Sequence, residues 1–393
     1  MRQPVIVSAT RTPIGSFNGS LSSVPATKLG SIVIGEALKK IQLSGGAVDE
    51  VIMGNVLSAG LGQAPARQAA LGASLPNSVG CTTINKVCGS SLKAVMFAAQ
   101  AIIAGDAEVL VAGGMESMSN APYLLTKART GYRMGSGELV DSMIHDGLWD
   151  VYNQFHMGAA AEICARMLKI SREEQDEYAL MSFERAREAQ NTGRSAREIV
   201  PVDVPGNSLA SVTVSEDEEP KRVSLSNLSH LKPAFEKHGS VTAGNASSIS
   251  DGAAALVVVS EEKARILGLR PLAKIIGYTA YATEPAWFTT APAKAIQALL
   301  QRTDRSVAGV DLFEINEAFA VCSIAVNREL GLDPNRVNVR GGAVALGHPI
   351  GASGARILTT LIRGLEDLDA RCGVASLCIG GGEAIAMMVQ RET

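Results

Sequence analysis

Short runs of β-branched residues alternate with helical patterns along this chain, and this order restricts the fold more than any other feature. In the first part, strands are predicted over 5–8, 50–56 and 108–112, and helices over 27–41, 68–73 and 92–104. In the last part, strands are predicted over 312–315 and 374–378, and helices over 293–301 and 352–364. Strands and helices in this order predict mixed or parallel sheets with helices packed on their faces. We therefore expect an α/β fold.

An approximate internal repeat relates the two parts. Residues 71–77 resemble 330–335, and residues 111–116 resemble 378–383. If the repeat reflects a duplication, Cys88 and His348 occupy corresponding places in two similar halves. Two such halves could face each other across one site.

The segment between these halves differs in character. It is dense in charge, and Ser171 followed by Glu174 is a capping box that predicts a helix running to about Asn191. The acidic run 216–219 follows later in the segment. We interpret the segment as an insertion that covers the site, with most of its charges on a solvated face.

Composition excludes several classes of protein. The chain has 393 residues, of which 46% are hydrophobic and 19% charged, with a formal net charge of -3. These values are typical of a globular protein without a basic field for nucleic acid. Zinc-finger spacing, a Walker loop and a Rossmann fingerprint are absent from the sequence. We expect a cytoplasmic protein that binds neither nucleic acid nor membrane, with its six cysteines reduced and no metal site.

Cys88 stands at the entrance of a predicted helix and is followed by Gly89. Unpaired amides and the positive dipole end at such a position favour the thiolate form of cysteine. Glycine beside it lets backbone amides approach a substrate closely. Cys88 is therefore a candidate nucleophile, with an inert buried cysteine as the alternative.

Three further residues stand beside glycines or at strand ends. His348 lies in a glycine-flanked turn, Asn316 follows a predicted strand, and Cys378 ends a strand before three glycines. Polar site residues commonly lie at strand ends in α/β folds, and three glycine amides could form an anion-binding nest. The structural alternatives are a core histidine, a helix N-cap and a cysteine that fills the sheet.

Four motifs together resemble the thiolase family, and the resemblance covers essentially the whole chain. They are Asn85-Lys86-Val87-Cys88-Gly89-Ser90, Asn316-Glu317-Ala318-Phe319, Gly347-His348-Pro349-Ile350-Gly351 and Cys378-Ile379-Gly380-Gly381-Gly382. The resemblance implies the thiolase fold: two similar βαβα halves with mixed five-stranded sheets, in a layered α-β-α-β-α arrangement, plus an inserted loop domain. The implied boundaries are 1–118 with 247–270 for the N-terminal half, 119–246 for the CoA-binding insertion and 271–393 for the C-terminal half.

The resemblance also implies an acetyl-CoA C-acetyltransferase that works by ping-pong acyl transfer. Cys88 would accept the acetyl group, His348 would activate its thiol, and Cys378 would move a proton at the α-carbon of the second acetyl-CoA. Asn316 would hold a water that forms one oxyanion hole with His348. The amides of Cys88 and Gly380 would form the other. A thioester enolate needs such a base and such donors.

Further positions match those that line the pantetheine tunnel or contact CoA in the family. They are Leu148, His156, Met157, Phe235, Ala243, Ser247, Phe288, Ala318 and Phe319, with Lys221 or Arg222 facing a CoA phosphate. The expected partners are acetyl-CoA, acetoacetyl-CoA and CoA, with no cofactor or metal. A homotetramer, built as a dimer of dimers, is also implied.

Two alternatives differ from this interpretation in substrate or in class. A 3-ketoacyl-CoA thiolase of broader chain length is the nearest enzyme, and His156 with Met157 favours the short-chain type instead. A thiolase-like acyl-CoA or lipid carrier is the non-enzyme alternative. The presence of all four catalytic positions argues against the carrier.

Overall fold

The computed structural model describes residues 2–205 and 211–392, so the chain ends at 1 and 393 lie outside the described residues. Its centre is a ten-stranded mixed sheet in the order β14-β15-β16-β13-β1-β12-β5-β3-β4, with β2 paired to β12. The sheet falls into two half-sheets that meet where β1 pairs with β13. That junction consists of only two residue pairs, Val5 with Lys274 and Ile6 with Ala273.

The N-terminal half-sheet has five long strands, as expected from the sequence. β3 runs parallel to both β4 and β5, while β12 runs antiparallel to β5 and β1. Its strands are β1 (Pro4–Arg11), β2 (Gly15–Ser16), β3 (Glu50–Gly54), β4 (Gly80–Ile84), β5 (Val109–Ser117) and β12 (Ser250–Ser260). Its helices are α1 (Ala26–Lys39), α2 (Pro65–Gly72), α3 (Ser90–Ala104) and α7 (Glu261–Ile266).

The C-terminal half-sheet has the same pairing pattern. β14 runs parallel to β15, which is antiparallel to β16, which is antiparallel to β13. Its strands are β13 (Ala273–Ala282), β14 (Leu312–Ile315), β15 (Cys372–Ile379) and β16 (Glu383–Gln390). Its helices are α8 (Ala291–Arg302), α9 (Ala320–Leu330), α10 (Ala343–Leu346) and α11 (Ser353–Asp367).

The expected fifth strand of this half is reduced to a single parallel bridge between Phe313 and Val337. The next residue, Asn338, has a φ of 47°, which turns the chain away from the sheet. Its side chain then replaces the strand: Oδ1 accepts from the Ile315 amide at 2.8 Å, and Nδ2 donates to the Ile315 carbonyl at 2.8 Å. The backbone groups of β14 are therefore satisfied without a longer partner.

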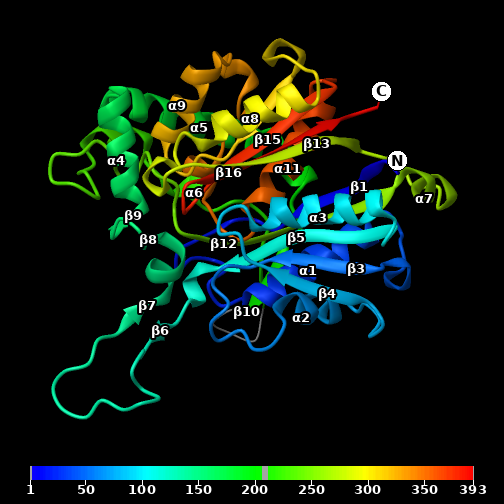
Figure 1. Ribbon diagram of the computed structural model, residues 1–393, viewed down its shortest axis with the longest axis horizontal. Helices are drawn as coiled ribbons and strands as arrows, with labels where there is room; N and C mark the ends of the chain where they lie inside the picture. Colours follow the sequence, from blue (N-terminus) through cyan, green and yellow to red (C-terminus); the bar gives the residue numbers. More distant parts are fainter. Residues whose placement is uncertain (1, 206–210, 393) are drawn as a thin grey trace.

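Five layers result, which confirms the predicted fold class (Figure 1). α3 and α11 lie between the half-sheets and share one apolar core with strands of both. α1 and α2 cover the outer face of the N-terminal half-sheet, and α8 and α9 that of the other. Among the described residues, one window, Val87–Ala104, is long and apolar enough to cross a membrane by length and composition. It contains α3, whose apolar character the core position explains.

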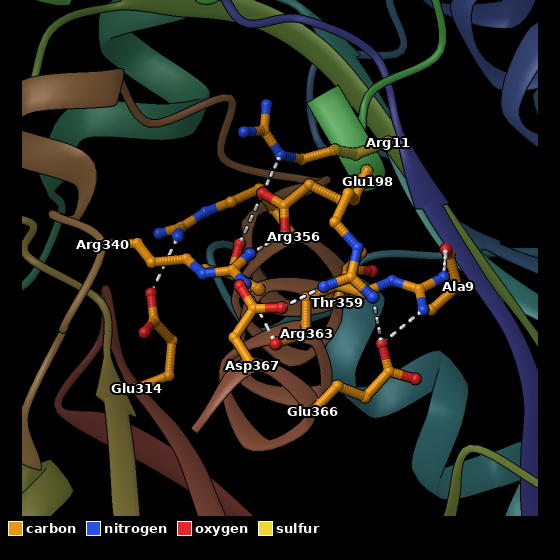
Figure 2. A network of polar contacts seen from close by, with 12 residues as sticks. Ala9, Arg11, Glu198, Glu314, Arg340, Arg356, Thr359, Arg363, Glu366 and Asp367 are labelled. Carbon is orange, nitrogen blue, oxygen red and sulfur yellow. Dashed lines mark hydrogen bonds and ion pairs between the residues drawn. The ribbon is translucent and has the colours of Figure 1, made fainter. Parts of the chain in front are cut away.

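A buried network of ion pairs joins the halves to the middle segment (Figure 2). Arg11 of β1 donates to Glu198 at 2.7 Å and to both oxygens of Asp217 at 2.6 and 2.9 Å. Thr360 of α11 donates to the same Glu198 at 3.1 Å. Arg356, also on α11, pairs with Glu314 of β14 at 3.0 Å. Because these charges are buried and paired, the network fixes α11 relative to both half-sheets.

The middle segment contains the predicted helix and several short hairpins. α5 begins with the predicted capping box, in which the Glu174 amide donates to Ser171 Oγ at 3.2 Å. The elements are β6 (Tyr123–Leu124), β7 (Val140–Asp141), β8 (Trp149–Asp150), β9 (Phe155–His156), α4 (Met157–Leu168), α5 (Arg172–Asn191), β10 (Val202–Pro205), β11 (Ser211–Val214) and α6 (Glu219–Arg222). The domain boundaries at 118, 246 and 270 stay a prediction.

The strand registers correct one match of the internal repeat. Gly54 on β3 pairs with Gly114 on β5, and Ile315 on β14 pairs with Ser376 on β15. Two residues further along, Glu116 therefore corresponds to Cys378. The expected match of 111–116 to 378–383 was wrong, because the first range lies within a strand and the second forms a strand end and the turn to β16.

Candidate active site

A cavity of about 320 Å³ opens between the two halves and the middle segment. Cys88, His348 and Gly380 line its inner end. All nine residues that were expected to form the tunnel also line it: Leu148, His156, Met157, Phe235, Ala243, Ser247, Phe288, Ala318 and Phe319. Residues from all three parts of the chain thus meet at one apolar cavity with a few polar groups, which is the form of a small-molecule site.

The turn that carries Cys88 is tight and strained. Val87 has a φ of 46°, a conformation that β-branched residues rarely adopt. The Ser90 side chain closes the turn by donating to the Val87 carbonyl at 2.7 Å and accepting from the Lys86 amide at 2.8 Å. A Cβ at Gly89 would collide with Ile379 of β15. The turn therefore packs closely against the end of β15 and brings Cys88 there.

The Cys88 thiol is protonated at neutral pH. Burial, together with nearby Cys378, raises its pKa to about 12, although the amides of Gly380 and of Cys88 itself hydrogen-bond the sulfur and act in the opposite direction. The expectation that the helix entrance favours thiolate was wrong in its net effect, because desolvation outweighs the amides. A thiol of this kind needs a base before it can attack an acyl group.

His348 meets this need. Its Nδ1 lies 2.6 Å from Ser353 Oγ, which itself donates to the Pro349 carbonyl at 2.9 Å. Because the serine proton is used there, Nδ1 carries the imidazole proton and donates, and Nε2 keeps its lone pair. Burial, and in second place the charge of Arg356, lower the pKa of His348 to about 3. The neutral ring can therefore accept a proton at Nε2.

Asn316 lies on the far side of this imidazole, 3.4 Å from His348 Nε2 through its Nδ2. It follows β14 directly and is 2% exposed. Its Oδ1 has no hydrogen-bond partner among residues 2–205 and 211–392. A buried polar atom left without a partner is commonly found at a site where a further group binds.

Cys378 is the last residue but one of β15, and it is buried and not among the residues that line the cavity. It interacts with Cys88 and hydrogen-bonds the thiol of Cys322 on α9, with Cys164 of α4 nearby. Burial raises the pKa of the Cys322 thiol well above its usual value, so Cys322 stays protonated. The sequence did not predict that Cys322 lies beside Cys378, because a cysteine within a helical pattern and outside any motif is interpreted as an ordinary core residue.

One part of the tunnel wall consists of packed aromatic rings. The His156 ring stacks on Phe235 with centroids 4.9 Å apart, and Phe235 meets Phe319 edge-on at 6.0 Å. His156 Nδ1 accepts from the Gly158 amide at 3.0 Å, and burial lowers its pKa. Ser247 donates through Oγ to the Ala318 carbonyl at 2.8 Å. Ring stacking and these two hydrogen bonds therefore fix the positions of the wall residues.

Lys221 and Arg222 do not line this cavity. Both are exposed on α6, where Lys221 pairs with Glu216 and Arg222 lies 3.4 Å from Glu218. Their contact with a CoA phosphate stays a prediction. Among the described residues, the structure contains no group of three or more side chains that could hold a metal ion.

Comparisons with known proteins agree along the full chain. Residues 4–262 match the family described as Thiolase, N-terminal domain, and residues 269–391 match Thiolase, C-terminal domain. Acetyl-CoA acetyltransferase 2 of Arabidopsis thaliana is 56% identical over 391 residues, covering 99% of this chain and 97% of that protein. Acetyl-CoA acetyltransferase of Cupriavidus necator is 52% identical over 100% of both chains. A probable acetyl-CoA acyltransferase of Staphylococcus aureus is 49% identical, also over 100% of both.

Proposed function

The chain belongs to the thiolase family, and on that premise we propose that it is an acetyl-CoA C-acetyltransferase. It condenses two acetyl-CoA into acetoacetyl-CoA and CoA, and catalyses the reverse thiolysis. One observation carries the proposal: a neutral imidazole, a half-buried thiol and Gly380 line one apolar cavity.

The first half-reaction transfers an acetyl group to Cys88. His348 Nε2 takes the thiol proton as Sγ attacks the thioester carbon of acetyl-CoA. The amides of Cys88 and Gly380 hold the oxygen that becomes negative. The C–S bond to CoA then breaks, and the departing thiolate takes the proton of the Cys378 thiol, which leaves Cys378 as thiolate and His348 with a proton on Nε2. An acetyl-cysteine and free CoA result.

The second half-reaction forms the carbon–carbon bond. Cys378 removes a proton from the methyl group of a second acetyl-CoA, and His348 with a water on Asn316 stabilises the enolate oxygen. The enolate carbon attacks the acetyl carbon on Cys88. When the tetrahedral intermediate collapses, Cys88 leaves as thiolate and takes back the proton held by His348, while Cys378 keeps the proton from the methyl group.

The pocket for the acyl group is shaped in part by Phe288, which is 3% exposed and lines the cavity. We propose that this pocket also admits a 2-methyl branch. Comparable rates of thiolysis of acetoacetyl-CoA and its 2-methyl analogue would support this assignment. If the 2-methyl analogue is not cleaved at all, the pocket does not admit the branch and this assignment is wrong.

The assembly that we propose is a homotetramer. Support comes from the hairpin of β6 and β7, which projects from the body (Figure 1) and exposes large apolar side chains. These include Tyr123, Leu125, Met134 and Leu139. Exposed apolar groups on a projecting segment are typical of an interface. Light scattering of the purified protein measures the assembly. Action in the cytoplasm, without a cofactor beyond the CoA thioesters, is part of the same proposal.

The decisive test of the reaction is Cys88→Ala. Thiolysis of acetoacetyl-CoA should fall by at least about 10⁴-fold, because no acyl-enzyme can form. Mass spectrometry should find the acetyl group on Cys88 of the unaltered protein after mixing with acetyl-CoA. Cys81→Ala is the matched control, since Cys81 is a half-buried thiol on β4 that does not line the cavity. Thiolysis that survives Cys88→Ala would remove the proposed mechanism.

A further inference from the structure

The N-terminal half contains a counterpart of the Asn316 and Cys378 pair. Asn55 follows Gly54 of β3 as Asn316 follows Ile315 of β14. Glu116 stands two residues beyond the paired Gly114, as Cys378 stands two beyond the paired Ser376. The two strand ends therefore present the same pair of positions, and in the N-terminal half a carboxylate occupies the place of the thiol.

This carboxylate is fully buried and accepts four N–H donors. Oε1 accepts from Asn55 Nδ2 at 2.9 Å and from the Leu57 amide at 3.1 Å. Oε2 accepts from the Val56 amide at 3.0 Å and from the Gly351 amide at 2.9 Å. All four partners are donors, so the ionised form satisfies them all, while burial opposes that form and raises the pKa of Glu116 to about 7.

The fourth donor belongs to the turn His348–Gly351 of the other half. A Cβ at Gly351 would lie 2.5 Å from Glu116 Oε2, and a Cβ at Gly54 would lie 2.8 Å from the Gly351 carbonyl oxygen. The turn thus fits into the N-terminal strand ends only because both positions are glycine. At its other end the His348 amide donates to the Ser248 carbonyl at 3.0 Å.

We propose that Glu116 is a positioning residue for catalysis. By holding Gly351, it fixes the turn that places His348 Nε2 within 3.4 Å of Asn316 and at the cavity that Cys88 also lines. Asn55 orients the carboxylate for this contact and also donates to the Met115 carbonyl at 3.1 Å. The inference rests on the proposed role of His348 as the base for Cys88.

Glu116→Gln tests the proposal because an amide NH₂ would face the backbone donors that the carboxylate now accepts. The measured quantity is the rate at which iodoacetamide alkylates Cys88, which depends on His348 removing the thiol proton. We expect Glu116→Gln to slow alkylation by about tenfold, since small displacements of a catalytic group have large effects on rate.

A double-mutant cycle with His348→Ala separates positioning from general loss of structure. In the His348→Ala background, Glu116→Gln should change the alkylation rate by less than about twofold, because the group that it positions is gone. The proposal would be overturned if Glu116→Gln lowered the alkylation rate equally in both backgrounds, or if it did not lower the rate in the protein that retains His348. If His348→Ala alone alkylates as fast as the unaltered protein, the proposed base fails instead.

Asp251→Asn is the matched control. Asp251 is a second fully buried carboxylate beside Glu116, and it accepts from the Ser119 amide at 3.0 Å and from the hydroxyl groups of Ser117 and Ser119. None of these partners belongs to the His348 turn. Alkylation of Cys88 in Asp251→Asn should therefore stay within about twofold of the rate in the unaltered protein. Where Glu116→Gln fails to fold, Glu116→Asp keeps the charge but withdraws it from Gly351. It should show the same slowing and the same dependence on His348.

Discussion

At the ends of β3 and β5 the N-terminal half places Asn55 and Glu116, and at the ends of β14 and β15 the C-terminal half places Asn316 and Cys378. Both pairs are buried on equivalent backbones. Glu116 has four donors on its two oxygens, whereas Asn316 Oδ1 has no partner among the described residues. Asn55 Oδ1 lacks a partner among these residues in the same way, so the amide oxygens do not distinguish the pairs. We call Asn316 and Cys378 the open pair, because they contact His348 and Cys88, which line the cavity. Asn55 and Glu116 are the closed pair, because four donors hold Glu116 in place.

Each half also sends a turn onto the strand ends of the other. The His348 turn packs onto Gly54 and Glu116, and the Cys88 turn packs onto Ile379. The duplicated framework therefore holds the turn of the base at the strand ends of the N-terminal half, and the reaction takes place at the strand ends of the C-terminal half. Reactivity follows from which strand end carries a thiol beside Cys88, and the carboxylate at the other end holds the turn that carries the base.

The largest effect should come from Cys378→Ala, which removes the reactive member of the open pair. Turnover in thiolysis should fall by about 10²- to 10⁴-fold, the range for loss of a general acid or base. Cys88 should still be acetylated by acetyl-CoA, since that step needs no proton from the α-carbon. Steady-state kinetics and mass spectrometry of the acyl-enzyme measure the two effects.

Cys372→Ala serves as the control for this variant, because Cys372 is a buried thiol at the opposite end of β15. Turnover of Cys378→Ala within about tenfold of the unaltered protein would show that the open pair does not supply the base.

A smaller effect is expected at the first turn of α11. Ser353→Ala removes the acceptor that keeps the proton of His348 on Nδ1. The other tautomer then becomes accessible, and kcat should fall by about tenfold with little change in KM. Ser91→Ala is the control, since Ser91 Oγ accepts from the Ala355 amide of the same helix at 2.9 Å without touching the imidazole. Equal losses in both variants would assign the effect to helix packing.

The smallest effect, on stability, should have opposite signs at the two turns. Burial raises the pKa of Glu116 to about 7 and lowers the pKa of His348 to about 3. The folded protein therefore holds a proton on Glu116 that the unfolded chain releases above pH 4.5, and this stability is lost as the pH rises through about 7. The unfolded chain binds a proton at His348 below pH 6.5 that the folded protein refuses, and stability is lost as the pH falls toward about 3.

Each contribution amounts to about 1.4 kcal/mol per pH unit within its range. Between pH 4.5 and 6.5 the contributions of Glu116 and His348 should nearly cancel, while Glu314, whose pKa burial raises to about 8, adds the same slope to the unaltered protein and to both variants. Glu116→Gln should leave the slope of His348, and His348→Gln should leave that of Glu116. Denaturant unfolding at several pH values measures the free energy of unfolding, and variants with the same pH dependence would contradict the opposed signs.

Much of the active site could be predicted from the sequence, because motifs name residues directly. Cys88, His348, Asn316 and Cys378 lie in four motifs, and all nine expected tunnel residues line the cavity. The net pKa direction of Cys88 could not be predicted, since the helix-end amides are local but the burial that opposes them comes from distant segments. Cys322 and Glu116 were missed as well, because their partners Cys378 and Gly351 lie far away in the sequence. Ser353 was missed because only the conformation of the turn shows that its hydroxyl reaches His348.

The sequence by itself determined the alternation of strands and helices, the capping of α5 and the chemical types at the site, since these depend on neighbours within a few residues. The tertiary structure decided which strand end stays open, which nitrogen of His348 is free and how many residues the fifth strand keeps. The free nitrogen and the length of the fifth strand depend on hydrogen bonds within the C-terminal half, from His348 to Ser353 and from Asn338 to Ile315. The open strand end depends on desolvation and on hydrogen bonds between the halves, such as that from the Gly351 amide to Glu116. Those terms exist only once the two halves have packed together.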